Sequence, residues 1–84
     1  MLIKPHIEIE FDAKHAILVF NDTELYDFVE DYLLEKHDIR SEYVTQSESG
    51  YRLFFDKNRS SDIEKALSKL DDNEIETVWR LNNN

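Results

Sequence analysis

Residues 16–34 read AILVFNDTELYDFVEDYLL, and two different periodicities meet within them. Residues 16–20 are continuously apolar and β-prone, as expected of a strand that is buried on both faces. The polar residues 21–24 then place Glu24 three positions after Asn21, which is typical of a helix start. Apolar residues follow at helical spacing, at positions Leu25, Phe28, Val29, Tyr32 and Leu33. The segment therefore predicts a buried strand that leads directly into an amphipathic helix over residues 22–38.

Weaker patterns on both sides of this segment predict the other strands. Alternating apolar residues over 6–11 predict a half-buried strand that forms a hairpin with residues 16–20. Residues 42–46 and 51–55 predict a second hairpin, whose loop contains Gly50, the chain's only glycine. A positive φ is expected at that glycine because it has no Cβ.

The C-terminal part is expected to contain one helix and one strand. A capping box over residues 61–64 begins a second helix, whose apolar stripe includes Ile63 and Leu67. Ile75, Thr77, Trp79 and Leu81 then occupy alternate positions, which predicts a final strand over residues 75–81. Residues 82–84 are expected to form a frayed tail.

These elements predict a single α+β domain over residues 1–84, in the order β-β-α-β-β-α-β. We expect an antiparallel sheet of about five strands with two helices on one face. Residues 16–81 resemble the ferredoxin-like arrangement, with residues 6–11 as an extra N-terminal strand. The first strand of that fold is central and has two neighbours already. Residues 6–11 therefore require a different strand order or pair with a second subunit.

Composition narrows the classes of function. Because the chain has no cysteine, disulfides, thiolate metal sites and cysteine nucleophiles are excluded. No apolar run approaches the ~18 residues of a membrane span, and residues 1–10 do not resemble a signal peptide, so a cytoplasmic protein is expected. The net charge of −9 opposes direct binding to nucleic acid or to an anionic membrane.

No enzyme site is evident in the sequence, and no catalytic residue, cofactor or metal site is predicted. The three histidines do not show the i, i+4 spacing of helical zinc ligands. Zinc bound by His6 and His15 together with Glu8 or Glu10 is the minor alternative. One glycine is too few for a phosphate-binding loop, and nothing indicates a cleft that would separate the pKa values of two carboxyls.

The predicted first helix is unusually acidic, with seven acidic residues over 22–38 against Lys36 and no arginine. Like charges at i, i+4 destabilise a helix, and acids near its C-terminal end oppose the helix dipole. A solvated helix face that maintains solubility is the simpler interpretation. The alternative is a surface for a basic protein partner, with a leucine as apolar anchor. Its predicted contacts are Asp27, Glu30, Asp31, Leu34 and Glu35.

Several strands appear apolar on both faces if Gln46 pairs with Tyr51 in the second hairpin. Two helices cover one face of a five-stranded sheet, so apolar residues on the other face would need a partner, most simply a second copy. The candidate homodimer face consists of Ile17, Val19, Tyr43 and Phe54. Residues 50–55 also resemble the aromatic strand of the RNA-recognition motif, although Ser49 replaces the expected basic residue.

Two functional hypotheses follow. The first is a small acidic protein-binding module, such as an inhibitor or immunity-type protein, that covers a basic surface of another macromolecule. The second is a dimeric, non-catalytic regulatory or scaffold module of ferredoxin-like shape. Both rest on charge and size and on analogy rather than on a motif.

Overall fold

The predicted buried strand lies at the centre of the molecule in the computed structural model, which describes residues 1–83. This strand, β3 (His15–Phe20), pairs with β2 (Ile7–Phe11) on one side and with β5 (Gly50–Asp56) on the other. The edge strands are β1 (Leu2–Lys4) and β4 (Tyr43–Ser47), so the order is β1-β2-β3-β5-β4, with every pair antiparallel. The α+β class and the five-stranded antiparallel sheet are thus confirmed.

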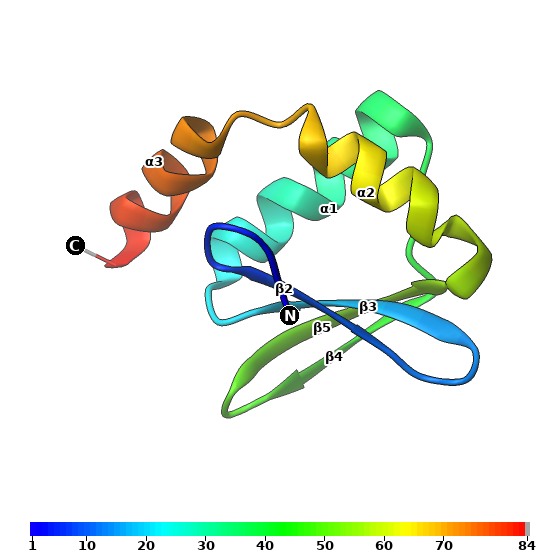
Figure 1. The fold of residues 1–84 in the computed structure, drawn as a ribbon. Helices are drawn as coiled ribbons and strands as arrows, with labels where there is room; N and C mark the ends of the chain where they lie inside the picture. Colours follow the sequence, from blue (N-terminus) through cyan, green and yellow to red (C-terminus); the bar gives the residue numbers. More distant parts are fainter. Residues whose placement is uncertain (84) are drawn as a thin grey trace.

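Three α-helices lie on one side of this sheet (Figure 1): α1 (Thr23–His37), α2 (Ser60–Ser68) and α3 (Asp72–Asn83). A short 3₁₀ helix, η1 (Lys57–Arg59), leads from β5 into α2. One face of the sheet therefore packs against helices and the other does not. Two helices were expected in this layer, and the third replaces the predicted final strand.

The prediction of a strand over residues 75–81 is wrong, because these residues lie within α3. Ile75, Val78 and Trp79 recur at i, i+3 and i+4, and all three pack into or against the core. Residues 75–81, in which alternation predicted a strand, therefore also fit the spacing of a helix. Asn82 and Asn83, expected to fray, belong to α3 as well, whereas residue 84 lies outside the described residues.

The fifth strand comes instead from the N-terminus. β1 adds to β2 at the edge of the sheet, and β2 occupies the position beside β3 that the final strand of a ferredoxin-like fold would take. Residues 6–11, for which the sequence left a different strand order or a second subunit open, therefore add to the sheet of their own chain. The predicted element order is wrong at both ends, whereas β3, α1, β4 and β5 follow each other as expected.

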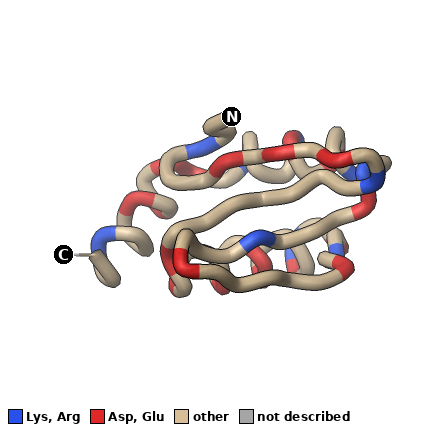
Figure 2. Tube along the Cα trace, turned by 90° about the horizontal axis from the view of Figure 1, so that it is seen from below, with Lys and Arg blue, Asp and Glu red and all other residues tan. Residues whose placement is uncertain are grey.

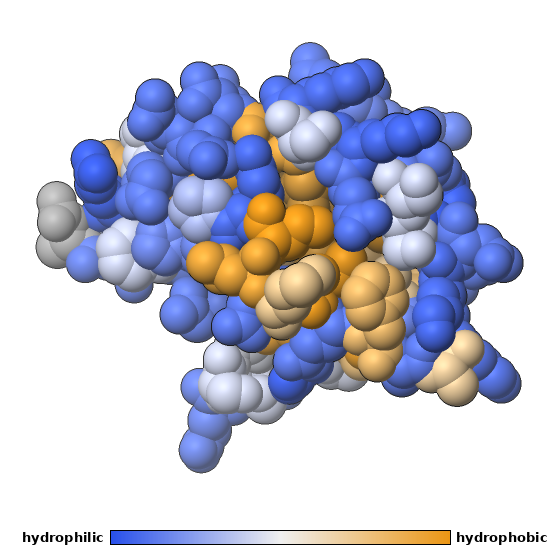
Figure 3. All heavy atoms as spheres, viewed as in Figure 1, coloured by the Kyte–Doolittle hydropathy of each residue, from blue (hydrophilic) through white to orange (hydrophobic). Residues whose placement is uncertain are grey.

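The core lies between the helix layer and one face of the sheet. Alternate residues of β2, β3 and β5 point into it, and the buried residues of α1 face them. Its largest fully buried side chains include Phe20, Phe55, Ile7, Ile9, Leu18, Leu25, Leu33 and Leu53. Apolar side chains also reach the surface near the middle of the face in Figure 3, where the N-terminal strands lie below the helices.

The turn between β1 and β2 attaches α3 to the sheet. His6, with a left-handed φ of 63°, stacks on Trp79 with ring centroids 4.1 Å apart. Its Nε2 lies 3.0 Å from Oε1 of Glu76, and Lys4 forms an ion pair with Asp72. These contacts join the N-terminal residues to α3 along its length.

The β4–β5 hairpin has the predicted register, with Gln46 opposite Tyr51. Its glycine adopts a φ of 129°, which L side chains rarely adopt. A Cβ added to Gly50 would lie 2.0 Å from the carbonyl oxygen of Phe20, a backbone atom of the central strand. The hairpin can approach β3 this closely only with glycine at this position.

We therefore expect Gly50→Ala to lower the free energy of unfolding by about 2 kcal/mol or more, since both the backbone conformation and the contact become strained. Urea unfolding followed by the fluorescence of Trp79, the single tryptophan, measures the change. Glu48→Ala, at an exposed position in the same loop, is the matched control and should change stability by less than about 0.5 kcal/mol. Equal stabilities of the two variants would contradict this account of the hairpin.

Candidate functional site

Acidic side chains form a continuous row along the exposed surface of α1. Members four residues apart are separated by slightly more than one helical turn, or roughly 6 Å along the axis. Glu30 is on the other flank, half-buried, where it accepts a hydrogen bond of 3.2 Å from the Ser41 hydroxyl. We call the exposed set the acidic row: Glu24, Asp27, Asp31 and Glu35.

The domain's own cations do not neutralise the acidic row. Within residues 1–83, no ion pair involves any of its four carboxylates. The arginines that do form ion pairs lie on other elements, as in the pair of Arg52 with Glu10. Burial raises the pKa of the Tyr26 hydroxyl, and the charges of Glu30 and Asp27 raise it further. The four carboxylates of the acidic row thus have no counter-charge at ion-pair distance within residues 1–83.

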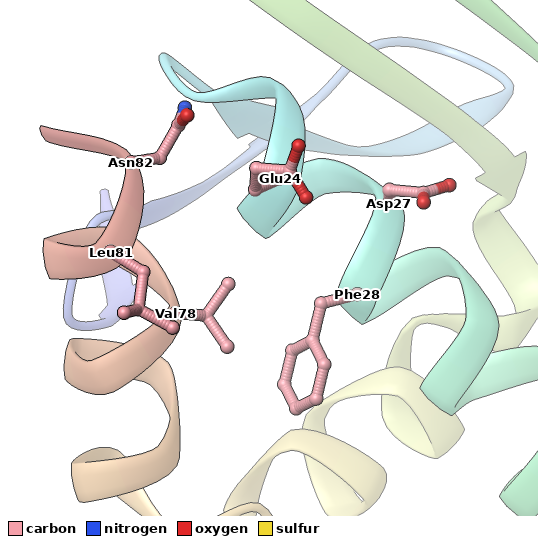
Figure 4. Close-up of a pocket in the computed structure, with 6 residues that line it drawn as sticks. All are labelled: Glu24, Asp27, Phe28, Val78, Leu81 and Asn82. Carbon is pink, nitrogen blue, oxygen red and sulfur yellow. The ribbon is translucent and has the colours of Figure 1, made fainter.

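The predicted apolar anchor, Leu34, is half-buried and presents only part of its side chain. A larger apolar surface lies beside the acidic row, in a groove between α1 and α3 (Figure 4). There the side chains of Phe28 and Val78 point toward one another from the two helices. Leu81 of α3 is 84% exposed at the same groove.

The groove consists of two adjoining hollows of about 500 and 340 Å³, which share Phe28 and Val78. Two members of the acidic row, Glu24 and Asp27, line the first hollow, and Glu74 lines the second. Apolar surface therefore lies directly next to carboxylates, and neither hollow is lined by lysine or arginine.

The sequence did not reveal this groove, because the wall that α3 forms was expected to be a strand. Val78 and Leu81 lay within that predicted strand, and Phe28 of the predicted first helix was expected in the buried stripe. The signal that could have revealed α3 is the helical spacing of Ile75, Val78 and Trp79. The packing of α3 beside the acidic row depends on tertiary contacts, and a local sequence pattern contains no information about these contacts.

Asp22 links the two helices at one end of the groove. It is the N-cap of α1, with its carboxylate accepting from the Leu25 N–H at 2.9 Å. The same carboxylate accepts hydrogen bonds from the side-chain amides of Asn82 and Asn83, at the end of α3. Burial acts to raise the pKa of Asp22, but the bonds from Asn82, Leu25 and Asn83 outweigh it and hold the pKa below its ordinary value.

A lowered pKa means that the Asp22 carboxylate stabilises the fold above pH 4, and that this contribution disappears as the pH falls through the folded-state pKa. Asp22→Asn should therefore be less stable than the parent by about 1–2 kcal/mol at pH 7, because a neutral amide loses the charge-assisted bonds from Asn82 and Asn83, and the difference should shrink as the pH falls through the folded-state pKa. Urea unfolding across this pH range measures it. Glu48→Gln, at an exposed loop position, is the control, and a pH-independent deficit in Asp22→Asn would contradict the assignment.

By strand register, the four residues of the candidate dimer face lie on the side of the sheet away from the core. Figure 2 shows the backbone of the sheet from this side. Ile17 is opposite Phe54, which is opposite Tyr43, and the two aromatic rings stack at 4.5 Å. Ile17 is only 7% exposed, so the neighbouring side chains already cover it. Val19, the next residue of β3 on the same face, lies opposite Arg52.

A histidine completes the aromatic cluster on this face. The His15 ring contacts Tyr43 and Phe54 edge-on, at centroid distances of 5.6 and 5.4 Å. Its Nδ1 lies 3.1 Å from a carboxylate oxygen of Asp12, and its Nε2 lies 3.1 Å from one of Glu42. The ring therefore connects the β2–β3 turn to the beginning of β4.

The histidines of the minor zinc alternative do not converge. His6 contacts Glu76 and Trp79, whereas His15 contacts Asp12 and Glu42. Among residues 1–83, no group of three or more candidate ligands has a geometry that could hold a metal ion. Over the same range, no helix combines the length and apolar composition needed to span a membrane.

Comparison with known proteins gives no match for this chain among protein-family models, curated proteins or solved structures. Its function must therefore be inferred from its own surfaces.

Proposed function

We propose that this protein is a small acidic binding module that covers a basic surface of a protein partner through α1. The observation on which the proposal depends is the acidic row, four exposed carboxylates without an ion pair within residues 1–83. A partner that offers lysines or arginines at matching spacing would supply the missing counter-charges. Covering such a surface blocks its other ligands, as an inhibitor or immunity-type protein does.

The acidic row has an energetic cost that supports a role in binding. Asp27 and Asp31, and Asp31 and Glu35, are like charges at i, i+4, each of which destabilises a helix by a few tenths of a kcal/mol. Glu35 also lies in the last turn, where a negative charge opposes the helix dipole. Docking of a basic partner removes both penalties, and the negative potential accelerates the encounter.

The net charge favours a protein over other macromolecules as the partner. A chain of net charge −9 is repelled by nucleic-acid phosphates and by anionic lipid head groups. Basic protein surfaces, including those that themselves bind phosphates, have the opposite sign. We therefore expect a basic protein as the partner and no direct contact with nucleic acid or membrane.

Reversal of charge within the acidic row should abolish capture of this partner. We expect the variant Asp27→Lys/Asp31→Lys/Glu35→Lys, immobilised and exposed to a lysate of the source cell, to lose a basic protein that the parent retains. The matched control is Glu8→Lys/Glu48→Lys/Glu64→Lys, which changes the net charge equally at exposed positions on other elements.

Binding to the captured protein, once purified, should weaken by about tenfold or more between low and high salt, as screening predicts. Mass spectrometry identifies the captured proteins, and calorimetry gives the affinities. An identical set of proteins on both charge-reversed variants, or an affinity that salt does not change, would rule out the acidic row as the binding surface.

A dimeric scaffold is the second candidate function, and the edge strand β4 favours it. All five residues of β4 are exposed and uncharged, and the strand has a neighbour on one side only. Edge strands commonly contain lysine, proline or a bulge that prevents pairing with another chain. Tyr43 and Val44 leave 47% and 42% of their surface exposed there. Two copies could join their sheets along this edge.

This candidate predicts that the protein dimerises with increasing concentration and that Thr45→Lys, at the middle of β4, abolishes the dimer. Sedimentation velocity over a wide range of concentration measures the association. Thr77→Lys makes the same substitution on α3 and should leave the dimer intact. A protein that remains monomeric at every concentration would exclude the scaffold.

A further inference from the structure

The groove between α1 and α3 provides apolar contact area next to the acidic row. Phe28 and Val78 face each other across it and are half-buried, while Leu81 is 84% exposed at its rim. Its two hollows, of about 500 and 340 Å³, lie within the ~300–1,000 Å³ range of sites that hold small molecules. Both hollows are open to solvent and are large enough to receive apolar side chains of a ligand.

The charges around the groove define what can enter it. Glu24 and Asp27 line one hollow, Glu74 lines the other, and the remaining polar lining residues are uncharged: Asn73, Thr77 and Asn82. An apolar ligand with positive charge on its flanks complements this surface. A second copy of the chain does not, because it brings a net charge of −9 to the same carboxylates.

The shape of the groove favours a polypeptide segment. Two helices form its walls, and an amphipathic helix laid between such walls places apolar side chains at i, i+3 and i+4 in the hollows. Lysines or arginines on the flanks of that helix would then reach the acidic row. This geometry uses apolar contact for affinity and charge for orientation.

We propose that the binding partner inserts large apolar side chains of a cationic amphipathic helix into the α1–α3 groove. This inference rests on the proposed function and adds the recognition element of the partner to it. Leu81, Val78 and Phe28 are then the apolar contacts, and the half-buried Leu34 is outside them.

Two synthetic peptides of equal length and charge test the groove separately from the acidic row. One is a lysine–leucine amphipathic helix, and in the other every leucine is alanine. We expect the lysine–leucine peptide to bind at least about tenfold more tightly, since only its side chains fill the hollows. Calorimetry measures both affinities, and ¹⁵N NMR should show the largest shift changes in α1 and α3.

A groove variant and a matched control show whether the preference for the lysine–leucine peptide arises in the groove. Val78→Thr/Leu81→Gln keeps charge and approximate volume but makes the groove polar, so its affinity for the lysine–leucine peptide should fall to that for the lysine–alanine peptide. Val44→Thr/Leu2→Gln makes the same changes at exposed positions of the sheet and should retain the preference. Leu81→Gln alone changes a residue that is 84% exposed, so this variant should fold normally. It should still reduce the preference for the lysine–leucine peptide.

The outcomes separate the two proposals. Equal binding of both peptides to the parent, or a leucine preference that survives in the groove variant, would overturn the groove and leave the acidic row as the binding surface. Failure of both peptides to bind at low ionic strength would overturn the acidic row and the groove together. Loss of the preference in the groove variant alone supports the inference.

Discussion

The fold depends on the pairing of β3 on both of its edges. Its neighbours β2 and β5 precede and follow it in the chain, so hydrogen bonding along one buried strand joins the N-terminal hairpin to the hairpin that follows α1. Leu18 and Phe20 then enter a core that both hairpins and the helices share. Both edges of this strand are therefore occupied, and the helices that follow pack on one face of the sheet (Figure 1).

Because helices cover only one face of the sheet, the helix side and the uncovered sheet face differ in their surface chemistry. On the uncovered face, the sheet shields its own apolar residues: Phe54 and its neighbours cover Ile17, and His15 connects the aromatic rings to two carboxylates. On the helix side, the third helix packs beside α1 instead of over the sheet. A groove results, and its position next to the acidic row places apolar and charged groups within the same surface.

Asp22 connects local structure with this surface. As the N-cap it satisfies a backbone N–H of α1, and its remaining acceptor capacity receives the amides at the end of α3. One carboxylate therefore holds the beginning of one groove wall against the end of the other. The Asp22 contact that shapes the groove thus lies at the beginning of α1, whereas the acidic row extends from the first turn of this helix to its last.

Local patterns in the sequence were sufficient to predict β2, β3, α1 and the β4–β5 register, because alternation, helical spacing and Gly50 each act over a few residues. They also predicted Asp27, Asp31 and Glu35 of the acidic row as surface residues, since helical geometry alone places them on one side of the helix. They could not predict β1, which is a strand only because β2 offers it an edge. The segment containing Ile75, Val78 and Trp79 fits both a strand and a helix locally, and packing against α1 and His6 determines that it is a helix. The walls of the groove are α1 and α3, which are far apart in the sequence, so the groove exists only after long-range contacts have brought these helices together.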